Sequence, residues 1–591
     1  MKIARVRVHN YQSIIDAAVR VDDYLLLVGA NNAGKSTFLN AIRLFYGDLK
    51  WDEKDFPLKG SLDEEVWIEI DFALNHEEWG RLPPQYQTNS QKKLTLRRFF
   101  RLPADSIRKV KPKGDNIYAV DDGKVAEDSF FGAKGVATGK LGNVVYIPAV
   151  TTASEQMKLT GPSPFRELMR IVLGQYVFPT PEYKDVKAAI KALNKAGSGS
   201  SGFFSVFTTQ MNSRLQPDWG VSMELAITPP SEDDVMKTML APAFKDQALN
   251  NAEVEFGRFG QGMQRSVLNA LIELLASFQT SSVKSPLQED EAKPSKEKRE
   301  FSANLLLILY EEPEAFLHPS QQILLASKLH EIGRQPNRQV IATSHSSVFA
   351  SRKVEELHQM ARFERNDGHC SVHQVRSGEL LRELEKVKTE FEKRVIVGGH
   401  ASGSPAQQQN RDKFFFSLWL DAERAGIFFA NKVFLVEGPT EKALFDYLLS
   451  DAWAGQLKEL GNFAILDCSG KYNIPRFMLL MRAFGIKFGV MIDDDNNSVS
   501  KQPGGISHLE LNRMISEMCA RDGFRDTSCA NPVMLPDCLE AFLGLNVPAT
   551  DRFKPSEMLA ALQDPIVCGT LQLHALKAKF REAMGLPPAA P

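Results

Sequence analysis

A glycine-rich loop between a predicted strand and a predicted helix constrains the fold of this chain most. Residues 25–28 are a short apolar run that predicts a buried strand, and residues 38–44 have the pattern of a helix. Between them, residues 29–37 read GANNAGKST and match GxxxxGK[ST] in its proper strand–loop–helix context. In such loops, backbone N–H groups at the helix N-terminus bind phosphates. The loop therefore predicts an α/β domain that binds a nucleotide.

Two later segments supply the other parts of a nucleotide site. Residues 304–310 predict a strand that ends in Glu311 and Glu312, a Walker B segment. Glu311 would hold Mg²⁺, and Glu312 would polarise the attacking water. Residues 339–343 predict another short strand, followed by His345, which we expect to contact a γ-phosphate. The candidate nucleotide and Mg²⁺ ligands in these segments are Gly29, Asn32, Gly34, Lys35, Ser36, Thr37, Glu311, Glu312 and His345.

A second glycine-rich turn lies upstream of the Walker B segment. Residues 256–266 read FGRFGQGMQRS and lead into a predicted apolar helix over 267–276. An ABC-type ATPase has its signature motif at this place, where it closes on the γ-phosphate held by a partner subunit. Matched on Gly262 and Gln264, the usual signature serine falls on Gln261, and Gln264 joins the candidate nucleotide ligands. Gln156 is the candidate for a Q-loop glutamine.

The last third of the chain contains an apolar run that ends abruptly in carboxylates. Residues 432–436 predict a buried strand, which Glu437 follows directly. Gly438 allows a tight turn, and Thr440 opens a helical pattern. Glu441 is then expected in the first turn of that helix, so two carboxylates lie near one strand tip.

A second acidic run follows the next-but-one predicted strand. Residues 489–492 lead into Asp493, Asp494 and Asp495, and a period of two places Asp493 and Asp495 on one strand face. Converging carboxylates repel one another unless a cation neutralises them. Oxygen ligands suit Mg²⁺ or Mn²⁺. The two runs together predict a metal site that acts on a phosphate.

Composition bounds the class of protein. A chain of 591 residues is too long for one core and predicts about three domains. The N-terminus lacks the apolar stretch of a signal peptide, no run is long enough to span a bilayer, and six cysteines show no metal-ligand spacing. We therefore expect a cytoplasmic protein with reduced thiols and no membrane contact.

The charge of the chain argues against a surface that binds nucleic acid everywhere. Its formal net charge is −2, which still allows a local basic groove. One basic stretch is partly aromatic, and its charge pattern favours a solvated hairpin face over a nucleic-acid site. Its basic residues are Arg97, Arg98, Arg101, Arg108, Lys109, Lys111 and Lys113.

Changes in pattern along the chain suggest domain boundaries. Residues 162–193 predict helices that either pair subunits or decorate the ATPase, and residues 195–202 predict a flexible loop. Residues 285–300 predict a charged surface loop, and residues 398–410 the best domain boundary, followed by a helical lead-in. We expect an ATPase N-terminal part over 1–160, a helical insertion over 161–250 and an ATPase C-terminal part over 251–397. A linker with its lead-in helix over 398–430 and an acidic domain over 431–591 would follow.

These motifs as a set resemble known families. The stretches KIARVRVHNYQSI, GANNAGKST, FGQGMQR, LLLILYEEPEAFLHP and ATSHSS resemble ABC-type ATPases of the RecF/SMC/Rad50 group. VEGPTE followed by MIDDD resembles the TOPRIM signature. An ATPase followed by TOPRIM resembles the OLD (overcoming lysogenization defect) family nucleases and the Gabija nuclease. The resemblance implies an α/β multidomain fold, DNA cleavage dependent on Mg²⁺ or Mn²⁺, ATP as a second cofactor, and a homodimer or larger assembly, with a helicase as a further possible partner.

The same resemblance assigns residues to the cleavage site. Glu437, Glu441, Asp493 and Asp495 match the four family carboxylates, and Ser469 and Lys471 match its glycine–lysine loop. Glu540 matches a later acidic residue, and an ion-paired structural role for it is equally open. Two divalent ions roughly 3.5–4 Å apart would clamp the phosphate. Lys471 would then offset charge in the transition state.

Three functions remain open at this point. The leading one is a DNA endonuclease regulated by an ABC-type ATPase, in phage defence or DNA repair, which holds DNA through its backbone and reads little sequence. In it, the catalytic residues are Glu312 for ATP, and Glu437, Lys471 and Asp493 for DNA. A topoisomerase-like strand transferase would need a tyrosine nucleophile, for which Tyr447 and Tyr472 are nearby. The third is a non-catalytic, ATP-gated DNA clamp.

Overall fold

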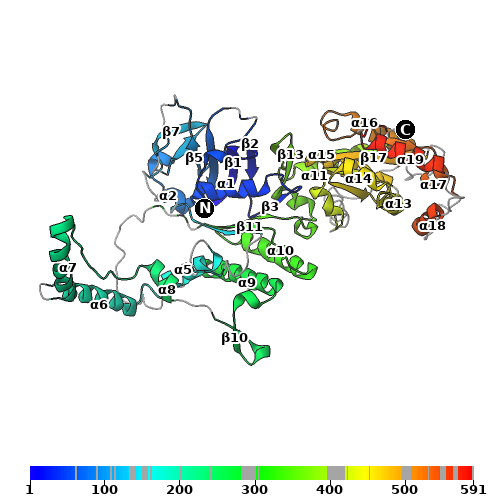
Figure 1. Cartoon of the computed structure of the whole chain (residues 1–591). Coiled ribbons are helices and arrows are strands. Elements are labelled where there is room, and N and C mark those ends of the chain that lie inside the picture. The colour runs from blue at the N-terminus through cyan, green and yellow to red at the C-terminus, as the bar shows by residue number, and fades with distance from the viewer. Residues whose placement is uncertain are drawn as a thin grey trace.

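The structure is a computed structural model of the chain (Figure 1). It describes residues 1–59, 61, 63–87, 91–104, 106, 109–111, 115–131, 140–149, 157–159, 163–199, 202–239, 243–280, 301, 303, 305–395, 420–421, 423–450, 453–495, 507–529, 531–545, 554–563 and 570–588. Gln156, Arg108, Lys113, the predicted loop over 285–300 and the predicted boundary over 398–410 lie outside the described residues.

The N-terminal part forms an antiparallel sheet with the strand order β2-β1-β4-β5-β6-β7. Alternating apolar residues give it one face that packs on α1 (Lys35–Tyr46) in a shared core. Its strands are β1 (Lys2–Tyr11), β2 (Ile14–Arg20), β4 (Val66–Ala73), β5 (Lys93–Arg101), β6 (Ile117–Asp121) and β7 (Lys124–Ser129). The basic stretch begins on β5, where Arg98 donates to the carbonyl oxygens of Leu44 and Phe45 at 3.2 and 2.5 Å. Arg98 thus binds the C-terminal end of α1 and does not lie on the solvated hairpin face that its charge pattern predicts.

A second sheet has the order β14-β13-β3-β12-β11-β8 and is parallel except at β14. Its strands are β3 (Tyr24–Val28), β8 (Asn143–Ile147), β11 (Leu306–Glu311), β12 (Arg338–Thr343), β13 (Met360–Asn366) and β14 (His369–His373). The strand predicted before the glycine-rich loop is confirmed as β3. The strands predicted before Glu311 and before His345 are confirmed as β11 and β12. Because these strands are parallel neighbours, the three motifs meet at one sheet edge.

Helices cover this sheet and extend away from it. The helix after the second glycine-rich turn, α9 (Gln261–Thr280), packs with α5 (Pro164–Tyr176), and α10 (Pro319–Arg334) packs on β12. In Figure 1, α6 (Pro181–Gly197) and α7 (Phe203–Trp219) project far from the sheets, and α8 (Glu232–Met239) lies nearer the body. The predicted helices are confirmed, but α6 continues into the expected loop. A short hairpin, β9 (Phe244–Asp246) with β10 (Ala252–Val254), was not expected.

The acidic region forms a parallel sheet with the order β16-β15-β17-β18. Its strands are β15 (Lys432–Val436), β16 (Phe463–Asp467), β17 (Lys487–Asp493) and β18 (Val533–Leu535). Its helices are α13 (Pro439–Ser450), α14 (Ala454–Leu460), α15 (Ile474–Ala483), α16 (His508–Ala520), α17 (Leu539–Leu543), α18 (Lys554–Gln563) and α19 (Thr570–Ala583). The strand predicted over 432–436 is confirmed as β15.

The two halves of the molecule share one hydrophobic core. Buried residues of β3, β11 and β12 belong to the same cluster as those of β15, α15 and β17. The helix α11 (Glu379–Arg394) packs against both α15 and α16 (Figure 1). The described end of the lead-in is a 3₁₀ helix, η7 (Arg424–Phe429). No described helix has the length and apolar character needed to cross a membrane.

Candidate functional site

The glycine-rich loop joins β3 to α1 in a geometry that requires glycine. Gly29 and Gly34 have φ values of 136° and 105°. A Cβ on Gly29 would lie 2.1 Å from the carbonyl oxygen of Phe363 on β13. The Lys35 ammonium donates to the carbonyl oxygens of Gly29 and Ala30 at 2.8 and 2.9 Å. The lysine is thereby folded over its own loop, at the N-terminus of α1 where phosphate binding is expected.

The rest of the loop presents polar groups around this lysine. Asn32 has a φ of 62°, and Ser36 is exposed on the first turn of α1. The Thr37 hydroxyl donates to the Gln12 side-chain oxygen at 3.1 Å. Burial lowers the pKa of Lys35 to about 8, against an opposing effect from three carboxylates. Those carboxylates are Glu312, Glu314 and Glu311.

The Walker B glutamates lie at the end of β11. The Tyr146 hydroxyl donates to one carboxylate oxygen of Glu311 at 2.9 Å, while the other, Oε1, is buried without a hydrogen-bond partner among the described residues. Arg265 donates to the carbonyl oxygens of Glu311 and Glu312 at 3.3 and 3.1 Å. A buried, unpartnered carboxylate oxygen beside a phosphate-binding loop suits a Mg²⁺ ligand. Arg265 was missed by the sequence analysis.

His345 is held in place by a residue that the sequence analysis also missed. The Glu314 carboxylate accepts the backbone N–H of His345 at 2.6 Å and the Ser344 hydroxyl at 2.9 Å. The imidazole Nε2 lies 3.8 Å from a Glu312 carboxylate oxygen. Burial, with the nearby Lys35 charge, lowers the pKa of His345 to about 4. The imidazole is therefore neutral at pH 7.

The second glycine-rich turn holds Gln264 inside the chain. The Gln264 amide nitrogen donates to the carbonyl oxygens of Phe256, Gly257 and Phe259, at 3.2, 3.3 and 2.6 Å. These bonds keep its amide nitrogen in the turn before α9. The nucleotide contact expected of Gln264 stays a prediction. Gln261, in the place of the usual signature serine, is exposed at the first position of α9.

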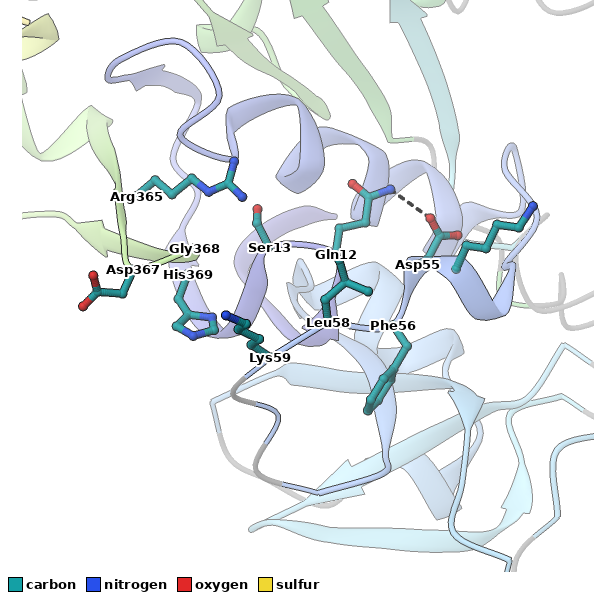
Figure 2. Close-up of a pocket in the computed structure, with 11 residues that line it drawn as sticks. Gln12, Ser13, Asp55, Phe56, Leu58, Lys59, Arg365, Asp367, Gly368 and His369 are labelled. Atoms are coloured by element: carbon teal, nitrogen blue, oxygen red, sulfur yellow. Dashed lines mark hydrogen bonds between the residues drawn. The ribbon is translucent and has the colours of Figure 1, made fainter.

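A cavity of about 520 Å³ lies beside the turn that joins β1 to β2 (Figure 2). It is lined by the β1–β2 turn with Gln12 and Ser13, by residues 54–59, and by the β13–β14 turn. That turn contributes Arg365, Asp367, Gly368 and His369. The Gln12 contact with Thr37 connects the cavity to the first turn of α1. No sequence motif marked this cavity.

At the acidic sheet, the ends of β15 and β17 are held together by Glu437. Its carboxylate accepts the backbone N–H of Asp493 at 2.7 Å, and its carbonyl oxygen accepts the N–H of Gly470 at 2.7 Å. The structure therefore brings together three of the predicted segments. One correction concerns Asp495: β17 ends at Asp493, and Asp495 has a φ of 47°. Asp495 thus lies beyond the end of the strand and not on the strand face that alternation predicts.

Lys471 lies among these carboxylates. It donates to the carbonyl oxygen of Asp493 and to the Asp495 carboxylate, the latter at 2.7 Å. Its ammonium is 3.4 Å from a Glu437 carboxylate oxygen, and the side chain is 3% exposed. The ammonium neutralises part of the acidic cluster from inside the protein.

The charge of Lys471 does not outweigh the burial of these carboxylates. Burial raises the pKa of Glu437 to about 7, and burial with the adjacent Glu437 raises that of Asp493 to about 8. Burial also raises the pKa of Glu441, whose carboxylate accepts the N–H of Gly438 at 2.9 Å. Such a site favours a cation.

Glu540 and Ser469 each have a basic partner from another segment of the chain. Glu540 is buried in the first turn of α17 and forms an ion pair at 2.6 Å with Lys554 of α18, a residue with no motif. Ser469 has a φ of 55°, and its hydroxyl accepts from Arg424 of η7 at 2.8 Å. Neither Lys554 nor Arg424 was anticipated.

The acidic cluster fits a divalent ion by the chemistry of its donors. It offers carboxylate and hydroxyl oxygens, which hard cations prefer. Within the described residues, no three Asp, Glu, His or Cys side chains are arranged to hold a metal ion. The Lys471 ammonium lies 3.4 Å from a Glu437 carboxylate oxygen and 2.7 Å from one of Asp495, so it would compete with a metal ion for these two carboxylates.

Two family models match parts of this chain. Residues 1–125 and 180–350, half of the chain, match the family described as "AAA ATPase domain". Residues 428–495 match "Overcoming lysogenization defect protein-like, TOPRIM domain". The chain belongs to the OLD family. Its ATPase and TOPRIM domains are thereby confirmed, and this OLD protein is an enzyme of the ATPase–nuclease class.

Relatives of this OLD protein cover most of its length. The Old nuclease of Escherichia phage P2 is 22% identical over 84% of this chain and 77% of its own. The endonuclease GajA of Bacillus cereus strain VD045 is 20% identical over 87% and 79% of the two chains. Among solved structures, an SMC head bound to the winged-helix domain of ScpA has a TM-score of 0.36 at 15% identity, covering 65% of this chain and all of that one.

Proposed function

We propose that this OLD protein is a DNA endonuclease that requires Mg²⁺ or Mn²⁺ and is regulated by ATP. The observation that carries the proposal is the cluster of Glu437, Glu441, Asp493 and Asp495 at the ends of β15 and β17, with Lys471 inside it. Buried carboxylates with raised pKa values support a cation as the missing partner. The relatives named as nucleases support DNA as the substrate.

Each part of the cluster has a proposed role. Glu437, Glu441, Asp493 and Asp495 would hold the metal, with Ser469 and Glu540 at its edges. A bound divalent ion would activate water and stabilise charge on the phosphate. Lys471 and Lys554, once released from their carboxylates, would bind phosphate oxygens. Since these groups would contact the phosphate backbone of DNA and not its bases, cleavage would depend little on DNA sequence.

The nucleotide site would bind ATP with Mg²⁺ in this scheme. Lys35 would exchange its two carbonyl contacts for the β- and γ-phosphates, and Ser36 with Glu311 would hold Mg²⁺. Glu312 would orient the attacking water, and neutral His345 would contact the γ-phosphate. The cavity in Figure 2 is the proposed place of the base and ribose, because it adjoins the first turn of α1.

We also propose that two copies assemble. The turn before α9 would face the nucleotide of a partner, as ABC-type signature motifs do. The projecting α6 has no buried residue, and its exposed Val186 and Leu193, with Phe203 and Val206 of α7, offer an apolar pairing surface. The proposed setting is phage defence or DNA repair.

Nicking of supercoiled plasmid with Mg²⁺ or Mn²⁺ tests the proposed cleavage. We expect Asp493→Asn to abolish metal-dependent nicking. Asp446→Asn serves as the matched control, because Asp446 is a half-exposed acid of α13 that pairs with Lys442. Equal cutting by wild type and Asp493→Asn would disprove the site assignment.

A further inference from the structure

The 3₁₀ helix η7 (Arg424–Phe429) touches the nucleotide site at one end and the acidic site at the other. At its C-terminal end, the Phe429 ring lies 6.5 Å from the His345 ring, centroid to centroid. The short helix after His345, η5 (Ser347–Phe349), packs against η7. The segment that we assign to the γ-phosphate is therefore in direct contact with η7.

The other end of η7 holds the loop that carries Ser469 and Lys471. Arg424 donates to the carbonyl oxygen of Asp467 at 3.0 Å and to its carboxylate at 3.2 Å. It also donates to the Ser469 hydroxyl at 2.8 Å. One guanidinium thus fixes both sides of the turn that leads to Lys471, with charge-assisted bonds.

The middle of η7 is packed into the core of the molecule. Ala425, Ile427 and Phe428 are at most 1% exposed and belong to the core shared by the two halves. Packed cores shift between discrete arrangements instead of deforming continuously. A displacement at Phe429 is therefore passed to Arg424.

A buried arginine next to η7 supplies its anchor. Arg362 of β13 donates to the carbonyl oxygen of Ala430 at 3.1 Å and to those of Phe484 and Gly485 at 3.1 and 3.2 Å. Arg362 is paired in the sheet with Val28, the last residue before the glycine-rich loop. Ala430 is thereby tied to the nucleotide-binding strand, and Arg424 lies at the far end of η7 from this tie.

We propose that η7 transmits the state of the nucleotide site to the metal-binding loop, with Arg424 as the positioning residue that grips that loop. The inference rests on the proposed function, since it assumes cleavage in the acidic cluster and ATP beside His345. A change in the His345 segment would move Phe429, rotate η7 about Ala430 and shift Ser469 and Lys471 through Arg424. Lys471 would then hold or release its carboxylates according to the nucleotide.

The ratio of cleavage rates with and without ATP measures this coupling in the full-length protein. We expect Arg424→Gln to reduce the effect of ATP on the cleavage rate by at least roughly fivefold, which is the lower end of typical coupling between sites. The ratio should therefore move towards one. ATP hydrolysis should be unchanged, because the partners of Arg424 among the described residues, Asp421, Asp467 and Ser469, lie outside the nucleotide site. Arg424→Lys, which keeps the charge but loses the planar fork, should restore part of the ratio.

Two further variants separate coupling from simple support of the loop. Phe429→Ala changes the opposite end of η7 and should lower the same ratio. Its effect should not add to that of Arg424→Gln, because both act on one route. Arg394→Gln is the matched control: Arg394 joins α11 to Glu517 of α16 at 2.6 Å and lies outside the route. It should leave the ratio at the wild-type value.

The outcomes distinguish this inference from the proposed function. Absence of metal-dependent cleavage by the wild type would refute the function itself. If the wild type cleaves but Arg424→Gln and Phe429→Ala keep its ratio, η7 does not couple the sites. Equal loss of cleavage with and without ATP in Arg424→Gln would likewise overturn the inference, because Arg424 would then only support the loop.

Discussion

The nucleotide site and the acidic site are built alike but use their buried lysines in opposite ways. Both lie at the carboxyl ends of parallel strands, and each encloses a buried lysine near carboxylate side chains. Lys35 binds the carbonyl oxygens of Gly29 and Ala30. Lys471 instead binds the Asp495 carboxylate and approaches Glu437. The Lys35 ammonium donates to neutral carbonyl groups, so its positive charge can attract an incoming anion. The Lys471 ammonium instead neutralises carboxylates of its own site.

This difference indicates which ligand each site accepts. Burial lowers the pKa of Lys35 and raises those of Glu437 and Asp493. The first site thus becomes more favourable when an anion arrives, and the second when a cation arrives. In the proposed function the two ligands would change the lysines differently, because phosphates would attract Lys35 whereas a metal ion would compete with Lys471 for its carboxylates.

The largest expected effect is the loss of ATP hydrolysis when Lys35, the lysine bound by carbonyl groups, is removed. Lys35→Ala should lower the rate of ATP hydrolysis by roughly 10²–10³-fold, because it removes a donor to the transferring phosphate. A phosphate-release assay measures this rate. Lys50→Ala, at an exposed lysine just after α1, should hydrolyse ATP like the wild type. A Lys35→Ala variant with normal hydrolysis would contradict the assignment of the nucleotide site.

The lysine inside the acidic cluster should show a double effect. Lys471→Met should slow plasmid cleavage by roughly 10²-fold through loss of transition-state stabilisation. It should also increase the rise in melting temperature caused by Mn²⁺, since the metal then meets carboxylates without their internal counter-charge. Lys487→Met, at the exposed start of β17, is the control. A smaller Mn²⁺-induced shift in Lys471→Met would show that the lysine does not compete with the metal.

A third lysine extends the comparison to the edge of the acidic site. Lys554→Met should slow cleavage by roughly tenfold, as expected for a group next to metal ligands. It should also destabilise the fold, because Glu540 would be left buried without its ion-pair partner. Adding Glu540→Gln should restore the melting temperature without restoring cleavage. Recovery of both would assign Lys554 a purely structural role.

The sequence predicted strand ends better than it predicted the residues that surround them. Glu311, His345 and Glu437 follow continuous apolar strands, and their positions at sheet edges follow from local pattern alone. Glu314, Arg424 and Lys554 carry no motif, and each reaches its partner from a different segment of the chain. Asp495 was misplaced because alternation holds only while the strand continues, and β17 ends two residues earlier. Tertiary contacts decide these positions.

The smallest expected effect is an exchange of protons with opposite sign at the two sites. Lys35 has a pKa of about 8, so ATP binding at pH 8 should take up as much as about half a proton, because the phosphates favour the charged ammonium. Glu437 and Asp493 have pKa values of about 7 and 8, so metal binding at pH 7 should release up to about one and a half protons. Calorimetric titration in two buffers of different ionisation enthalpy measures both numbers.

The same pKa values fix the sign of the pH dependence of stability. Folded Glu437 and Asp493 bind protons more tightly than their ordinary values of 4.5 and 3.8 allow in the unfolded chain. Without metal, their contribution to the free energy of unfolding is present below about pH 4 and is lost as the pH rises through 7 to 8. Asp493→Asn should flatten this slope, and Lys35→Ala should not. Proton release on ATP binding would remove the contrast between the two lysines. An unchanged pH dependence of the unfolding free energy in Asp493→Asn would do the same.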